Sequence, residues 1–299
     1  MHKLGRILPF LLVFLASQAW GGSLALILGE SSGVYEEFAN KLNDALTDSN
    51  WRVVATIPVS SPQPLPTADL IVTVGSEALT KALNRPDGPP IIATLLPRLS
   101  YERILAENRR TCRITAIYLD QPPARQAAFF RQLFPDQKRF GLLSSPETRN
   151  LAAQYRQAFS KQGLTLEIED ADTDKALLPA LNAILERSTA LLALPDNTIY
   201  RRNNIKAILI TAFRLQRPII GYSPAFVTAG ALAALHTTPA QDARQTAELI
   251  MSHGSNLPPP SGPAEFTVAI NPNVAQALGL KLPDEAAIRR ALLADRESR

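Results

Sequence analysis

The chain has little of what catalysis or metal binding usually requires. Its 299 residues include one cysteine, Cys112, and three histidines. A single cysteine forms neither an intramolecular disulfide nor a thiolate metal site, so the hydrophobic core must hold the fold together. Hydrophobic residues make up 46% of the chain, which makes such a core feasible. The sequence also lacks the H-E-x-x-H, G-x-S-x-G and phosphate-loop motifs of common enzymes. We therefore expect a protein that is not an enzyme and that uses no metal and no cofactor.

The few residues with catalytic potential have simpler interpretations. His236 is the only plausible general base for an exported hydrolase, but a histidine at the surface or in a hinge explains it better. Cys112 lies between Arg110 and Arg113, which favour a reactive thiolate. A cysteine at the start of a strand is nevertheless more often a small buried side chain. A hydrolase is thus a minor alternative.

A long hydrophobic run is also missing. Residues 7–16 are mostly apolar, but this run is half of the roughly 20 residues needed to span a bilayer. Lys3 and Arg6 lie at its start, and the small residues of 17–19 follow it. This pattern predicts a cleaved secretory signal peptide over residues 1–19, with an N-terminal membrane anchor as the alternative. No cysteine lies near the cleavage site, so we expect a periplasmic protein without a lipid anchor.

The chain has no large excess of charge of either sign. The formal net charge is +4, and loss of Lys3 and Arg6 with the signal peptide lowers it to +2. Pairs of arginines are far apart in the sequence and have no aromatic residues interleaved with them. This balance does not favour a polyanionic partner, so we expect no binding to nucleic acid.

Short apolar, β-branched segments recur along the chain, and most are followed by a segment in which apolar residues have helical spacing. Continuous apolar segments are typical of parallel strands that are buried on both faces. Alternation of strands and helices predicts βαβ units, so we expect an α/β fold with Rossmann-like parallel sheets. The expected strands cover residues 24–28, 52–57, 69–74, 90–95, 113–119, 139–143, 165–168, 190–194, 218–222 and 266–270.

Two proline-rich breaks divide the expected strands into groups. Residues 121–123 (QPP) follow the fifth strand, and residues 257–263 precede the last one. We expect lobe 1 to comprise residues 20–118 plus a returning segment, 240–299, and lobe 2 to comprise residues 119–239. One long sheet with a C-terminal addition is the alternative.

Small hydroxyl and amide residues follow several of the expected strands. In open α/β sheets, ligands bind beyond the carboxyl ends of the strands, beside helix N-termini whose backbone N–H groups can hold a carboxylate or a phosphate. The same residue types are the usual N-caps of helices, which is the alternative for each loop. The candidate ligand-binding residues in these loops are Ser31, Ser32, Ser76, Ser144, Ser145, Asp196, Asn197 and Ser223.

Asp196 is the most informative of these residues. It follows a buried-looking strand and precedes Asn197. Its carboxylate can bind an amine or a hydroxyl group of a ligand, or it can cap the following helix. The sequence leaves both roles open.

A set of short segments carries a resemblance to a known family. They are residues 121–135, 138–143, 194–198 (LPDNT), 218–223 (PIIGYS), 227–233 (VTAGALA) and 271–283, the last containing LGL-x-x-P. Together they resemble the ABC-transporter substrate-binding proteins of the tryptophan/tyrosine-type group, which have the type I periplasmic-binding fold. The resemblance covers roughly residues 116–283.

The resemblance implies a binding protein whose two lobes, joined by three crossovers, close around a small organic ligand, an amino acid or a related solute. It implies that the lobe 2 candidates and the lobe 1 candidates face one cleft, and it adds Thr94 to the lobe 1 set. The implied partner is an inner-membrane permease of an ABC-type uptake system, or a receptor. We expect the protein itself to be a monomer.

Two segments near the expected cleft depart from the family pattern. The family tends to have Asp-Pro after Thr94, whereas this chain has residues 95–98 (LLPR). The family often has a tyrosine-rich stretch where this chain has residues 235–239 (LHTTP). These departures motivate an alternative with the same fold, an envelope sensor or accessory protein that binds a ligand or a partner protein without serving transport.

Overall fold

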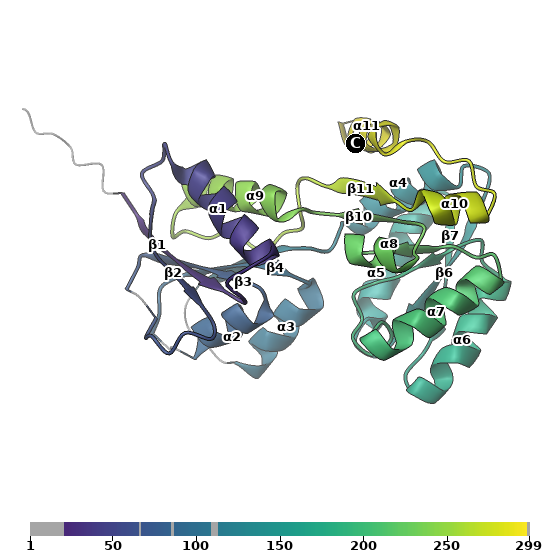
Figure 1. Ribbon diagram of the computed structural model, residues 1–299, viewed down its shortest axis with the longest axis horizontal. Helices are drawn as coiled ribbons and strands as arrows, with labels where there is room; N and C mark the ends of the chain where they lie inside the picture. The colour runs from purple at the N-terminus through teal and green to yellow at the C-terminus, as the bar shows by residue number, and fades with distance from the viewer. Residues whose placement is uncertain (1–20, 66, 85–86, 109–112, 298–299) are drawn as a thin grey trace, which may run out of the picture.

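The computed structural model describes residues 21–65, 67–84, 87–108 and 113–297, which form two α/β lobes side by side (Figure 1). The expected signal peptide and Cys112 lie outside the described residues. Within the described residues, no helix combines the length and the apolar character that a membrane span requires.

Lobe 1 is built on a five-stranded parallel sheet with the strand order β2-β1-β3-β4-β5. Its strands are β1 (Ser23–Leu28), β2 (Arg52–Pro58), β3 (Leu70–Val74), β4 (Ile91–Leu96) and β5 (Ile114–Tyr118). Its helices are α1 (Val34–Leu46), α2 (Ser76–Leu83), α3 (Arg98–Glu107) and α9 (Pro239–His253). Alternate residues of β1 point to opposite faces of the sheet, and helices cover both faces. Leu24 and Leu26 pack with Phe38 of α1 and Ala247 of α9, whereas Ile27 packs with the core under α2 and α3.

Lobe 2 is built on a six-stranded sheet with the order β11-β10-β9-β8-β6-β7, in which only β11 is antiparallel to its neighbour. Its strands are β6 (Arg139–Ser144), β7 (Thr165–Asp170), β8 (Leu191–Leu192), β9 (Ile219–Gly221), β10 (Ala233–His236) and β11 (Thr267–Ile270). Its longer helices are α4 (Pro123–Leu133), α5 (Arg149–Lys161), α6 (Asp174–Glu186), α7 (Arg202–Arg214) and α11 (Glu285–Glu297). Two short helices, α8 (Pro224–Ala229) and α10 (Pro272–Ala277), complete the lobe.

The two faces of the lobe 2 sheet are covered by different helices. Phe140 and Leu142 of β6 lie in a core that includes Phe159 of α5 and Leu292 of α11. Leu143, which points the other way, lies in the core beneath α6 and α7. The continuous apolar character of residues 140–143 therefore reflects burial on both faces, as the sequence predicts.

The chain passes between the lobes three times. The first crossover, residues 119–122, leads from β5 to α4, and the second, residues 237–238, leads from β10 to α9. The third, residues 254–266, leads from α9 to β11 and runs beside the first. There the backbone N–H of Tyr118 donates to the carbonyl of Ser261 at 2.9 Å. The three crossover segments together form the hinge.

Side-chain hydrogen bonds tie the three crossovers together. Gln121 Nε2 donates to Thr237 Oγ1 at 2.9 Å, and that hydroxyl donates to the carbonyl of Glu265 at 3.0 Å. The Arg125 guanidinium donates to Gln121 Oε1 at 2.7 Å and to the carbonyl of Pro263 at 3.0 Å. A movement of one crossover must therefore be accommodated by the other two.

The C-terminal part of the chain differs from the expected division into lobes. Residues 240–299 were expected to return to lobe 1, and α9 does so by packing on α1. β11, α10 and α11 instead belong to lobe 2, where the yellow C-terminal helix lies (Figure 1). The physical reason is burial, because Phe266, Ile288 and Leu292 complete the core on the α4 face of the lobe 2 sheet. A chain that starts in lobe 1 and crosses three times must also end in lobe 2.

Candidate functional site

The space between the lobes contains three adjoining pockets, here called the outer, inner and α3 pockets. The outer and inner pockets share Leu119, Tyr222 and Ser223, and the inner and α3 pockets share Pro195. Because neighbouring pockets have wall residues in common, they adjoin one another and together make up the interlobe cleft.

The outer pocket has a volume of about 280 Å³. It is closed by side chains from lobe 1, lobe 2 and the second crossover. Its wall consists of Val34, Tyr35, Leu95, Leu119, Tyr222, Ser223, Pro224, His236, Thr237, Thr238 and Pro239. Most of this wall is apolar or aromatic, which suits the body of a small organic molecule.

The inner pocket lies deeper, beside the first crossover, and has a volume of about 180 Å³. Its polar wall residues are Asp120, Gln121, Gln126, Tyr155 and Ser223. Its apolar wall comprises Pro97, Leu119, Ala193, Leu194, Pro195 and Leu235, with Tyr222 at the boundary to the outer pocket.

The α3 pocket, about 330 Å³, lies between α3 and two loops of lobe 2. Residues of α3 face Glu147, Pro195 and Asn197 across it. A direct polar contact also joins the lobes here, because the Arg98 guanidinium donates to Gln154 Oε1 at 3.3 Å.

Tyr35 covers the strand-end loops of lobe 1. A Cβ atom on either Gly29 or Gly75 would come within 2.9 Å of its ring, so the ring rests directly on these two glycines. Gly75 also has a φ of +94°, a conformation that a residue with a side chain rarely adopts. Glycines at the ends of β1 and β3 therefore make room for an aromatic wall of the outer pocket.

The four lobe 1 candidates do not line the three pockets. Ser31 and Ser32 are exposed beyond β1, and Ser76 is half-buried at the start of α2. Thr94 is fully buried, and its hydroxyl donates to the carbonyl of Thr73 at 3.0 Å. The side chain of Thr94 thus supports the neighbouring strand.

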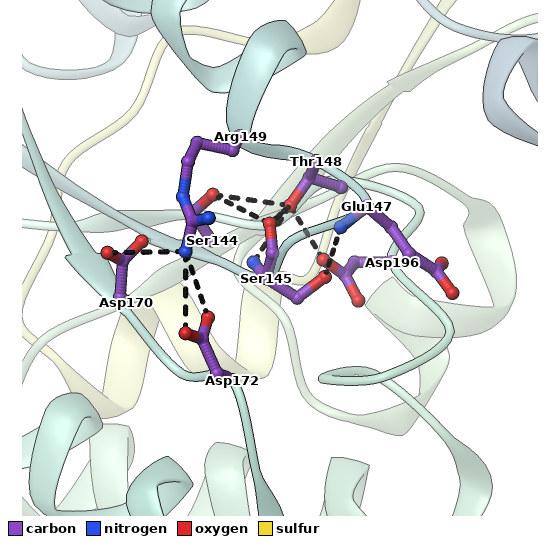
Figure 2. Close-up of polar contacts among 8 residues, drawn as sticks. All are labelled: Ser144, Ser145, Glu147, Thr148, Arg149, Asp170, Asp172 and Asp196. Atoms are coloured by element: carbon purple, nitrogen blue, oxygen red, sulfur yellow. Dashed lines mark hydrogen bonds and ion pairs between the residues drawn. The ribbon is translucent and has the colours of Figure 1, made fainter.

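The lobe 2 candidates at the end of β6 form a buried polar cluster (Figure 2). The backbone N–H of Ser145 donates to Thr148 Oγ1 at 3.0 Å, and Ser144 Oγ lies 3.4 Å from the same hydroxyl. Ser144, Ser145 and Thr148 are all buried, and none of the three lines a pocket of the cleft. Arg149, beside them, points toward Asp170 and Asp172 instead (Figure 2).

Asp196 belongs to this cluster and both of its carboxylate oxygens are engaged. Oδ2 accepts from the Thr148 hydroxyl at 2.7 Å, and Oδ1 accepts from the backbone N–H groups of Thr198 and Ile199 at 2.9 and 3.1 Å. With 2% of its surface exposed, the side chain has these contacts and little access to the cleft. The carboxylate of Asp196 therefore closes the turn at residues 197–199. It does not cap a helix, because α7 begins only at Arg202 and has Arg201 as its N-cap.

Two of the predicted residues do line the cleft. Ser223 lies on the wall of both the outer and the inner pocket, and its Oγ also caps α8 by accepting from the N–H of Phe226 at 3.2 Å. Asn197 is exposed on the wall of the α3 pocket.

Other cleft residues were not among the sequence-based candidates, chiefly Asp120, Gln126, Tyr222 and His236. Asp120 lies two residues after β5, and Tyr222 directly follows β9, so the rule that ligands bind at the carboxyl ends of strands could have identified both. Gln126 gave no such signal, because only packing against the hinge places this helical side chain beside the inner pocket.

The ionisable groups of the cleft have shifted pKa values because they are partly removed from water. Burial raises the pKa of the Asp120 carboxyl and lowers the pKa of the His236 imidazole, although Glu285 opposes the second shift. His236 lies at the end of β10, and its buried Nδ1 has no hydrogen-bond partner among the described residues. Among the described residues, no group of three His, Cys, Asp or Glu could hold a metal ion.

Comparison with known proteins agrees with this architecture. The chain resembles a conserved domain protein from Vibrio cholerae (18% identity, 90% of this chain and 98% of that chain, TM-score 0.58). It also resembles an ABC domain from Streptococcus pneumoniae in complex with L-Trp (16% identity, 90% and 98%, TM-score 0.58). A third structure is the ligand-free, open form of a substrate binding protein with adhesive properties from Clostridium difficile (13% identity, 88% and 96%, TM-score 0.65). These likenesses show the two-lobed α/β fold of type I periplasmic-binding proteins, as the sequence predicts.

A family assignment follows from the sequence comparison. Curated proteins give no significant match. The family described as ABC transporter substrate binding protein matches residues 66–291, which is most of both lobes. Its members bind solutes and are not enzymes, in agreement with the absence of a catalytic motif. The chain belongs to the family of ABC transporter substrate-binding proteins.

Proposed function

We propose that this protein is the periplasmic solute-binding component of an ABC-type uptake system, and that its lobes close around one small organic molecule. The observation that carries the proposal is the interlobe cleft, whose outer pocket has wall residues from both lobes. A molecule in the outer pocket would contact Tyr35 and Leu95 of lobe 1 and Tyr222 of lobe 2 at the same time. Such a molecule would stabilise the closed arrangement, because only there do both lobes contribute contacts.

The hinge supports closure as a rigid-body movement. Each lobe has its own buried core, whereas the crossovers are short segments held together by Gln121 and Thr237. Bending at the crossovers leaves both cores intact, which is the usual form of domain closure around a ligand. Family membership and the expected signal peptide support export and delivery to an inner-membrane permease.

A thermal-shift screen of a broad set of small metabolites tests the proposal. A ligand that binds only the folded protein adds RT ln(1 + [L]/Kd) to the free energy of unfolding and so raises the melting temperature. We expect at least one solute to raise it, and we expect Tyr222→Ala to weaken that effect. The control is Phe213→Ser, which changes an exposed side chain of α7 outside the cleft. If no solute has an effect, or if both variants respond like the wild type, the cleft is not the ligand site.

A second candidate function is an envelope sensor or accessory protein with the same fold. The exposed apolar side chains of Ile210, Phe213 and Leu215 on or beside α7 favour a protein partner for lobe 2. Capture of a receptor kinase by the wild type, but not by Phe213→Ser, would favour the sensor. Stimulation of a permease with its ATPase by the solute-loaded protein would favour transport.

A further inference from the structure

Two residues on the wall of the inner pocket each have a buried hydrogen-bond acceptor that the described residues leave unused. Gln126 is 3% exposed, and its Oε1 atom is buried without a partner. Asp120 Oδ1 is also buried without a partner, whereas Oδ2 of the same carboxylate accepts from the backbone N–H of Arg98 at 2.6 Å. Both residues line the same pocket. Native proteins seldom leave buried polar atoms unpaired, so two such acceptors on neighbouring wall residues of one pocket indicate an external donor.

Three side-chain donors near the pocket bind other partners. The Tyr155 hydroxyl donates to the carbonyl of Gln121 at 3.0 Å. The Arg98 guanidinium binds Glu102 at 2.7 Å and Gln154 at 3.3 Å, and the Arg125 guanidinium binds Gln121 and the third crossover. Within the described residues, none of these donors binds either of the two acceptor atoms.

The charge of the cleft limits what that donor can be. Asp120 is the only acidic side chain on the walls of the inner and outer pockets, and no lysine or arginine lies on either wall. A cation would gain a charge-assisted hydrogen bond to the Asp120 carboxylate, whereas a carboxylate on the ligand would find no basic side chain. Beyond the acceptors, Leu119 and Leu235 offer apolar contact, and Tyr222 offers an aromatic ring with a hydroxyl group.

We propose that the inner pocket binds the protonated amine of a small ligand through Asp120 and Gln126, and that the ligand needs an apolar body but no carboxylate. The ammonium group has three N–H donors, enough for both free acceptors. The apolar body then extends past Tyr222 into the outer pocket. This inference rests on the proposed function, and it replaces Asp196, whose oxygens are engaged, by Asp120 as the residue that binds the amine.

The test uses matched probes and titration calorimetry with thermal shift. Primary amines from n-butylamine to tryptamine are each compared with the alcohol and the carboxylic acid of the same skeleton. We expect at least one amine to bind and its matched alcohol and acid to bind at least about tenfold more weakly, as the loss of one charge-assisted hydrogen bond implies. Addition of a carboxylate, as in tryptophan against tryptamine, should not strengthen binding.

Two variants localise the binding. Asp120→Asn keeps an oxygen for the Arg98 N–H but removes the charge, and Gln126→Met keeps the side-chain length but removes the acceptor. Each should weaken amine binding at least about tenfold, whereas Asp136→Asn, on the surface of lobe 2, should leave it unchanged.

The inference is overturned if acids or zwitterions bind and amines do not, if none of the amines binds, or if both variants bind amines like the wild type. A broad screen that identifies a different class of solute would then leave the proposed function standing. A screen that identifies no ligand would contradict both this inference and the proposed function.

Discussion

At the scale of single residues, Asp196 shows how one sequence feature can serve two roles. A carboxylate after a buried strand suits a ligand amine and a helix cap equally well, but here its contacts with Thr148, Thr198 and Ile199 close the turn that follows the strand. The sequence could identify the loop but could not show that its polar atoms bind one another. The sequence likewise could not show that Ser144 and Ser145 form contacts within this cluster instead of facing the cleft.

Replacement of Asp196 by alanine should therefore affect stability more than ligand binding. The change removes three hydrogen bonds and leaves the buried Thr148 hydroxyl without its 2.7 Å partner, so we expect a loss of about 2 kcal/mol in the free energy of unfolding. Urea denaturation measures this loss, and calorimetry on the folded variant should give a ligand Kd within about threefold of the wild type. An unchanged stability with abolished binding would restore the amine-binding role to Asp196.

The buried carboxyl of Asp242 should make the stability of the folded protein depend on pH. It lies in the first turn of α9, and Oδ2 accepts from the N–H of Leu95 at 3.0 Å, where Leu95 has a φ of +50°. Complete burial raises the pKa of its carboxyl to about 7, although the Leu95 N–H opposes the shift. Since the folded-state pKa lies above the unfolded value, the neutral carboxyl stabilises the fold. That contribution is fully present below about pH 4 and is lost as the pH rises to about 7.

The test compares the wild type with Asp242→Asn between pH 4 and pH 8. The asparagine cannot ionise but keeps an oxygen for the Leu95 N–H. Relative to this variant, the wild type should lose up to about 1.4 kcal/mol of stability per pH unit between about pH 4 and pH 7. Parallel pH profiles of the two proteins in urea denaturation would show that Asp242 does not titrate in this range.

At the scale of elements, most strands could be predicted because parallel strands buried on both faces are continuous apolar runs. β10 (Ala233–His236) was missed, since its alanine-rich sequence has neither β-branched residues nor alternation. The assignment of β11 and α11 to the wrong lobe has another cause. Local pattern identifies Phe266 as part of a strand, but long-range packing decides which sheet it joins.

The N-terminus of α9 offers a test of how firmly the second crossover is held. Thr238 Oγ1 accepts from the N–H of Gln241 at 3.2 Å, and Gln241 Oε1 accepts from the N–H of Thr238 at 2.9 Å, which completes a capping box. Thr238→Ala should lower the free energy of unfolding by about 1 kcal/mol, and Thr238→Ser, which keeps the hydroxyl, should cost much less. Equal stabilities of the two variants in thermal denaturation would argue against the cap.

At the scale of the whole molecule, the fold and the family could be predicted from the sequence, whereas the cleft could not be described in detail. Segments such as residues 194–198 and 218–223 identify the family because they are local. The inner pocket depends on contacts between β5, α4, α5 and β9, which are distant in the sequence. Side chains such as Gln126 acquire their place in the site only when these elements pack.

The central claim is that the two lobes close on a small molecule held between them. Small-angle X-ray scattering tests it most directly, on the protein alone and saturated with the solute that raises its melting temperature most. Closure at the three crossovers should lower the radius of gyration on binding, and Tyr222→Ala should require more solute to reach the same value. A bound solute that raises the melting temperature but leaves the radius of gyration unchanged would contradict the account.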